Sequence, residues 1–218
     1  MTTTTNRDEG LITIRTEGVE LAGNLIVPPN ATAVVLFAHG SGSSRFSTRN
    51  RSVAAALRAG GLGTLLIDLL THDEELIDTR TSHLRFDIDL LARRLVGAAQ
   101  WLHAAHPELK IGVFGASTGG GAALVAAAAK PDLIAAVVSR GGRPDLAGDA
   151  LPKVKAPTLL IVGGDDAPVI EMNRQAYRQM KATFAKVEIV PGASHLFEEP
   201  GTLEKVAELA REWFRKYL

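Results

Sequence analysis

Short apolar runs alternate with amphipathic segments along most of this chain. Several runs are hydrophobic at every position, which is typical of strands buried on both faces of a parallel sheet. The first two candidates flank Gly18, which marks a turn, so this pair is predicted to be antiparallel. The predicted strands are 11–15, 20–27, 33–38, 63–68, 110–114, 133–139, 157–162 and 187–190.

Between the strands, apolar residues recur every three or four positions, which is the spacing of one helix face. The clearest such face lies between residues 84 and 106 and consists of Leu84, Ile88, Leu91, Leu95, Ala98 and Leu102. Residues 69–83 are polar and without this periodicity, and we expect an irregular loop there. The other predicted helices span about 53–60, 120–130, 169–180 and 202–218.

This alternation of strands and helices predicts an α/β fold, with a mostly parallel sheet covered by helices on both faces. Residues 1–10 are expected to be a disordered lead, and residues 11–218 a single domain without internal repeats. In such sheets, ligands bind at the carboxyl ends of the strands.

Composition narrows the function classes. The 24 basic residues balance the 24 acidic ones, so nothing indicates a nucleic-acid partner. The chain has no cysteine, which excludes disulfides, thiolate metal sites and a cysteine nucleophile. The polar first ten residues do not resemble a secretory signal, and no apolar run is long enough to span a bilayer. We therefore expect a cytoplasmic protein with no membrane partner.

The segment Gly115-Ala116-Ser117-Thr118-Gly119 has the form G-x-S-x-G and joins a predicted strand to a predicted helix. This arrangement is that of a nucleophile elbow, in which the serine hydroxyl is exposed at a sharp turn. The alternative is a glycine-rich turn that happens to contain a serine. A phosphate-binding loop is excluded because no G-K-[ST] follows.

Two further candidates also lie just past predicted strands, namely the Asp165-Asp166 pair and His195. With Ser117 they form the order Ser, Asp, His, one of three known orders of a catalytic triad. Ser117 would be the nucleophile, His195 its base, and one aspartate the group that orients the imidazole. In isolation His195 could be an ordinary loop histidine, and either aspartate could cap a turn.

A tetrahedral intermediate also needs donors for its oxyanion. We expect these to be the backbone N–H of Thr118, directly after the nucleophile, and that of Ser41, in the loop after Phe37.

Other titratable side chains are expected to be structural. His39 would hold its own loop by hydrogen bonds, and Asp68 competes only weakly as the triad acid. Two groups of residues partly resemble metal ligands. We expect the first to lie at the end of a helix and the second in a solvated loop. These groups are His103 with His106, and His72 with residues 73–75. We predict no metal site.

Taken together, the chain resembles the α/β-hydrolase superfamily, in its dienelactone-hydrolase-like branch, from about Gly18 to Leu218. The resemblance implies a three-layer α/β-hydrolase fold. The family pattern G-x-x-D-x-x-V matches residues 163–169 and assigns the triad acid to Asp166. The chain is similar to small hydrolases of this branch that occur alone or fused to phosphoribosyltransferase domains, and we expect no such second domain here. The most specific segments are residues 39–42, 115–119, 139–144 and 192–197.

The chain departs from this family in two respects. Dienelactone hydrolases proper use a cysteine nucleophile, so its absence favours a serine esterase. Many α/β-hydrolases also insert a helical cap where this chain has only residues 140–152, which implies a minimal cap and an open site for short acyl esters. Arg140 would either bind an acidic substrate group or be structural, and His83, Arg85 and Phe86 would line the pocket from the other side.

The predicted function is therefore a carboxylic ester hydrolase that acts on a small-molecule ester through an acyl-enzyme, without metal or organic cofactor. The same triad serves thioester hydrolysis, lactone hydrolysis and acyl transfer, because fold and triad do not fix the substrate. A non-catalytic binding protein of the same fold, or a designed sequence of weak activity, is the alternative.

Overall fold

The structure is a computed structural model that describes residues 10–218. Except for Gly10, the predicted disordered lead therefore lies outside the described residues.

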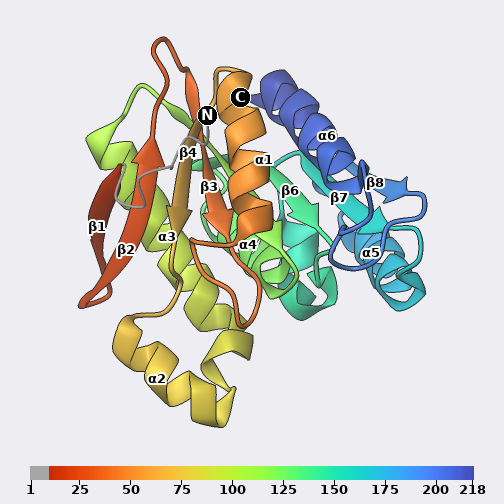
Figure 1. Cartoon of the computed structure of the whole chain (residues 1–218), viewed down its shortest axis with the longest axis horizontal. Helices are drawn as coiled ribbons and strands as arrows, with labels where there is room; N and C mark the ends of the chain where they lie inside the picture. Colours follow the sequence, from red (N-terminus) through yellow and green to blue (C-terminus); the bar gives the residue numbers. More distant parts are fainter. Residues whose placement is uncertain (1–9) are drawn as a thin grey trace.

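The centre of the molecule is an eight-stranded sheet of order β1-β2-β4-β3-β5-β6-β7-β8 (Figure 1). β2 pairs antiparallel with β1 and with β4, and all other neighbours are parallel. All eight predicted strands are present, and the predicted antiparallel pair is confirmed. The strands are β1 Leu11–Thr16, β2 Val19–Ile26, β3 Ala33–Ala38, β4 Gly63–Ile67, β5 Lys110–Ala116, β6 Ile134–Arg140, β7 Thr158–Gly163 and β8 Ala185–Val190.

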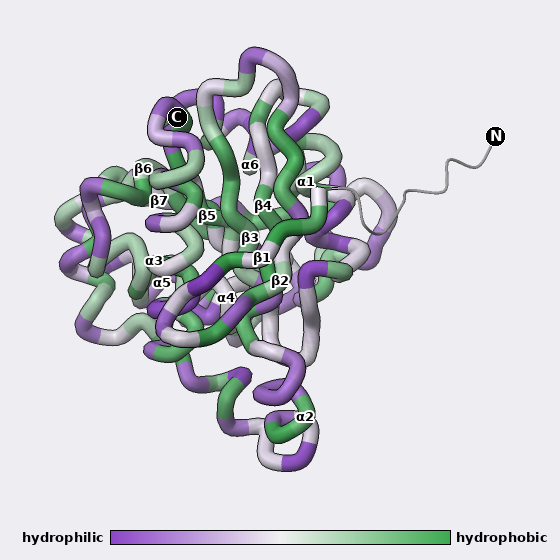
Figure 2. Tube along the Cα trace, turned by 90° about the vertical axis from the view of Figure 1, so that its left-hand side faces the viewer, coloured by the Kyte–Doolittle hydropathy of each residue, from purple (hydrophilic) through white to green (hydrophobic). Residues whose placement is uncertain are grey.

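Helices cover both faces of this sheet. Successive side chains of a strand point to opposite faces, so β3 sends Val34 and Leu36 into one apolar core and Val35 and Phe37 into another. The first core is covered by α3, α4 and α5, and the second by α1 and α6. Figure 2 shows the apolar strands at the middle of the molecule and polar segments at its margins. The helices are α1 Thr48–Ala59, α2 His72–Thr81, α3 Ile88–Ala105, α4 Thr118–Ala129, α5 Ala167–Gln179 and α6 Thr202–Tyr217.

The three layers confirm the predicted α/β-hydrolase fold with a minimal cap. Where larger members of the superfamily carry a helical cap, only the short 3₁₀ segment Pro144–Lys153 is present. Within residues 10–218, no helix is both long enough and apolar enough to cross a membrane.

The irregular loop predicted for residues 69–83 is wrong, because these residues contain α2. This helix protrudes from the edge of the molecule (Figure 1), and it has no apolar face, so periodicity gave no signal. A capping box begins it: the Thr71 hydroxyl accepts from the Glu74 N–H at 3.2 Å, and the Glu74 carboxylate accepts from the Thr71 N–H at 2.8 Å. The sequence T-x-x-E at residues 71–74 would have predicted this start.

Two other helix starts differ from the predictions. The amphipathic helix predicted from Leu84 begins at Ile88, because Asp87 caps it by accepting from the Leu90 N–H at 2.9 Å. The helix predicted from residue 53 begins at Thr48, where Ser47 is the N-cap. The earlier start of α1 matters because its first turn borders the site.

Candidate active site

Ser117 lies at the turn from β5 into α4, in a backbone conformation that is strained for a residue with a side chain. Its φ is 50° and its ψ is −120°, an arrangement normally tolerated where function requires it. The flanking glycines make the turn possible. A Cβ on Gly115 would lie 2.4 Å from the carbonyl oxygen of Gly119, and one on Gly119 would lie 2.4 Å from that of Ala38. These distances are shorter than any van der Waals contact, and they support the predicted elbow geometry.

His195 and Asp166 are in direct contact. Asp166 follows β7 and precedes α5, and His195 lies in the loop after β8. The His195 Nδ1 is 2.6 Å from the Asp166 Oδ2, while Asp165 is exposed and bonds the loop through its N–H to the carbonyl of Ala193. The geometry therefore pairs the histidine with the second aspartate. Asp68 is bonded to Arg45, both to its backbone N–H and to its guanidinium group.

Ser117 and His195 line the same cavity, which has a volume of about 220 Å³. Ser41 lies on its wall, and a Cβ on Gly40 would be 3.1 Å from the Cβ of Ser117, so this loop backbone approaches the serine closely. Thr118 is the first residue of α4, and the first N–H groups of a helix have no partner within it. Both backbone groups expected to bind an oxyanion therefore belong to segments that border Ser117.

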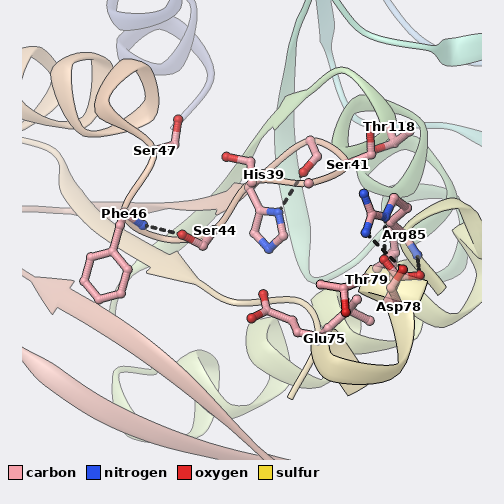
Figure 3. Close-up of a pocket in the computed structure, with 15 residues that line it drawn as sticks. His39, Ser41, Ser44, Phe46, Ser47, Glu75, Asp78, Thr79, Arg85 and Thr118 are labelled. Atoms are coloured by element: carbon pink, nitrogen blue, oxygen red, sulfur yellow. Dashed lines mark hydrogen bonds and ion pairs between the residues drawn. The ribbon is translucent and has the colours of Figure 1, made fainter. Parts of the chain in front are cut away.

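A larger cavity of about 480 Å³ adjoins this one, and the two share part of the loop after β3, including Ser41 (Figure 3). Its far wall comes from α2, with Glu75 and Asp78, and from Arg85. The Arg85 guanidinium holds Asp78 by an ion pair of 2.5 Å, and this contact together with backbone hydrogen bonds lowers the pKa of Asp78 against the effect of burial.

Of the three pocket residues predicted on this side, His83 and Phe86 line neither of these cavities. His83 is exposed and bonds to the Thr81 hydroxyl at 2.7 Å, and Phe86 is 54% exposed. Arg85, which was predicted with them, does line the larger cavity, because its side chain turns back to Asp78 of α2.

Arg140, the remaining predicted pocket residue, does line the cavity of Ser117. It ends β6 beside the elbow, and its carbonyl accepts from the Ser117 N–H at 3.2 Å. The sequence reading missed two neighbours on the same wall, Arg49 and Asn50. Both lie in the first turn of α1, which was predicted to begin later.

His39 is buried and acts as a link between two loops. Its Nδ1–H donates to the Gly40 carbonyl at 3.0 Å, and its Nε2 accepts from the Leu69 N–H at 3.0 Å. This is the structural role expected for it. Burial lowers the pKa of His39, and the Gly40 hydrogen bond and Asp68 oppose that shift only in part.

We expect acidification to destabilise the protein through His39. Because its pKa is lower in the folded state than in the unfolded one, the unfolded chain takes up the proton first as the pH falls. The stabilisation is complete above the unfolded pKa of about 6.5 and is lost as the pH falls toward and through the lowered value. Urea unfolding at about pH 7.5 and about pH 5 should show a larger drop for the wild type than for His39→Gln, which does not titrate. Equal drops would contradict this role.

The two histidines with metal-like spacing lie where a helix end was expected, since α3 ends at Ala105 and His106 is its C-cap. Within residues 10–218, no three or more His, Asp or Glu side chains come close enough together to hold a metal ion.

Comparison with known proteins agrees with this fold. The model of the dienelactone hydrolase family matches residues 21–218, so the chain belongs to this family of α/β hydrolases. A Mycobacterium tuberculosis protein named as a phosphoribosyl transferase is 56% identical over 203 residues, 92% of this chain and 44% of that protein. The chain thus spans less than half the length of this curated relative.

Two solved structures have a similar fold. A dienelactone hydrolase from Anabaena variabilis is 63% identical, with a TM-score of 0.93 over 95% of this chain and 97% of that one. An α/β serine hydrolase without a lid from Xanthomonas campestris is 18% identical, with a TM-score of 0.72 over 97% of this chain and 95% of that one. The second likeness concerns the fold alone.

Proposed function

We propose that this protein is a serine hydrolase that cleaves carboxylic esters through an acyl-enzyme. The observation that carries the proposal is the 2.6 Å contact between His195 Nδ1 and Asp166 Oδ2, in a site where His195 lines the same cavity as the strained Ser117. An aspartate bound to one ring nitrogen fixes the tautomer in which the other nitrogen accepts a proton.

Each residue then has a defined role. The His195 Nε2 removes the Ser117 hydroxyl proton as the serine oxygen attacks the ester carbonyl carbon. The N–H groups of Thr118 and Ser41 stabilise the negative charge that develops on the carbonyl oxygen. The protonated His195 next gives its proton to the departing alcohol oxygen. The same nitrogen then takes a proton from water as the water oxygen attacks the acyl-enzyme, and it returns this proton to the Ser117 oxygen as the acid leaves.

The cavity dimensions bear on the substrate. The cavity at Ser117 is smaller than the usual range of about 300–1,000 Å³ for small-molecule sites, and it opens toward the larger one bordered by α2. We propose small esters with short or unhindered acyl groups as substrates. Thioesters, lactones and acyl transfer use the same residues and remain the alternatives within the class.

The proposal is tested by hydrolysis rates of p-nitrophenyl esters of increasing acyl length, beside a matched thioester and a lactone. We expect turnover above the uncatalysed rate, highest for short esters. A folded protein that cleaves none of these compounds would favour the non-catalytic binding protein instead.

A further inference from the structure

Arg140 carries a buried positive charge for which the described residues provide no carboxylate partner. The residue is only 6% exposed. One guanidinium nitrogen donates to the Asn50 side chain at 3.3 Å, and the guanidinium carbon lies 5.8 Å from the Phe197 ring centre. The Nε–H, although buried, has no hydrogen-bond partner among the described residues.

An unpaired buried charge is costly, so buried arginines are normally paired with an acid. Here the neighbouring charge is Arg49, which has the same sign. Burial and Arg49 lower the pKa of Arg140 to about 10, and the group is therefore still protonated at neutral pH. Within residues 10–218, this desolvated cation is thus not neutralised by any acidic side chain.

The walls of the cavity are a second, independent observation. The cavity shared by Ser117 and His195 is lined by Arg140, Arg49 and the first turn of α1, and no acidic side chain of the described residues lines it. The N-terminal turn of a helix carries a partial positive charge and favours anions. Arg49 does have a partner, Glu198 at 3.0 Å, but that carboxylate is 62% exposed and lies outside the cavity.

The larger cavity differs in its charges. It is lined by Glu75 and Asp78 as well as Arg85. Burial and the nearby Asp68 raise the pKa of Glu75. The same burial and the same negative charge disfavour the binding of another anion on that side. The two cavities that share Ser41 therefore differ in charge, since two arginines line the smaller one and two acids with one arginine line the larger one.

We propose that Arg140, Arg49 and the N-terminal turn of α1 form an anion subsite, which binds a carboxylate or phosphate group of the substrate beside Ser117. The inference rests on the proposed function in one respect, namely that the anion belongs to the ester that is cleaved. The small volume of the cavity leaves room for the anionic group and the ester, so the rest of the substrate extends into the larger, polar cavity.

Binding can be tested without turnover. Inorganic phosphate or succinate is added in increasing amounts to Ser117→Ala protein, and the unfolding temperature is measured. Chloride at the same ionic strength serves as the reference. We expect a saturable rise in the unfolding temperature with at least one of the two ions. This rise should be lost when Arg140→Gln is combined with Ser117→Ala. The rise should persist in Arg215→Gln, a matched change at an exposed residue of α6. The ion that binds more tightly identifies the chemistry of the natural group.

The absence of any saturable rise, or an equal rise in Arg140→Gln, would overturn the subsite. If circular dichroism shows that Arg140→Gln is unfolded, two milder variants replace it. Arg49→Gln changes a partly exposed side chain and should weaken binding, whereas Arg140→Lys keeps the charge and should retain part of it.

Kinetics tests the link to catalysis. Two matched pairs are compared, in which the free acid and its methyl ester differ in charge and by one methyl group: p-nitrophenyl adipates for the acyl side and p-acetoxybenzoates for the alcohol side. Release of p-nitrophenol or of the acetyl group is followed, so that cleavage of the methyl ester is not counted. We expect the anionic member of at least one pair to have the higher kcat/KM. Arg140→Gln should lower kcat/KM for the anionic ester by about tenfold or more, as expected for loss of a charged hydrogen bond. The loss should arise chiefly from a higher KM, and Arg140→Lys should restore part of kcat/KM.

The outcomes separate the two proposals. Ester cleavage without any preference for the anionic member would overturn the subsite and leave the esterase proposal intact. Arg140-dependent binding of phosphate or succinate by a protein that cleaves no ester would support the subsite and contradict the esterase proposal.

Discussion

Replacement of Ser117 by alanine should reduce ester turnover by a factor on the order of 10⁶, the loss seen when the nucleophile of a serine hydrolase triad is removed. The reason is that no acyl-enzyme forms without the hydroxyl. The backbone of the elbow should persist, because its contacts to Arg140 and Arg143 are made by the main chain of Ser117. The measurement is kcat for a short p-nitrophenyl ester, with circular dichroism to show that the variant is folded.

Ser52→Ala is the matched control, since Ser52 is exposed on α1 and should retain full activity. Turnover within tenfold of the wild type in Ser117→Ala would show that another group is the nucleophile.

The second large effect is expected at the paired aspartates. Asp166→Asn should cost about 10⁴ in kcat, because an amide can stabilise the wrong imidazole tautomer and offers no charge to the imidazolium. Asp165→Asn makes the same chemical change one residue earlier, at an exposed side chain that does not contact His195. It should leave kcat nearly unchanged.

The comparison of these two variants is sharper than either alone. A greater loss in Asp165→Asn would move the triad acid to that residue and contradict the pairing in the structure. Equal and small losses would mean that neither carboxylate supports the base.

Most of the fold could be predicted from the sequence because its central strands are buried on both faces. The run 33–38 has no polar position, and all of its residues are buried, as are all residues of Thr158–Gly163. The helix α2 could not be recognised by the same rule. Only Asp78 of this helix is buried, so its polar and apolar positions follow no period, and its capping box is the one local signal.

The part of the site that could be predicted from the sequence is the one in which a reactive residue lies in a turn with a recognisable pattern. G-x-S-x-G fixes Ser117 because each glycine removes a collision that any side chain would cause. The choice of Asp166 over Asp165 came from a family pattern, and the structure pairs that residue with His195.

The pocket walls were harder to predict. Arg49 and Asn50 reach the cavity only because α1 starts at Thr48, and His83 and Phe86 line neither cavity because the chain turns Arg85 inward. The direction of a single side chain in a short turn depends on the pairing of its neighbours, here that of Arg85 with Asp78. Such pairings between separate segments leave no periodic signal in the sequence.

The central claim is that Ser117 is a nucleophile activated by His195 and Asp166. The most direct test is the intact mass of wild-type and Ser117→Ala protein after incubation with a fluorophosphonate, which reacts with activated serines. The account predicts a single adduct on the wild type and none on the variant. A folded wild type without adduct, or an adduct of equal yield on Ser117→Ala, would contradict it.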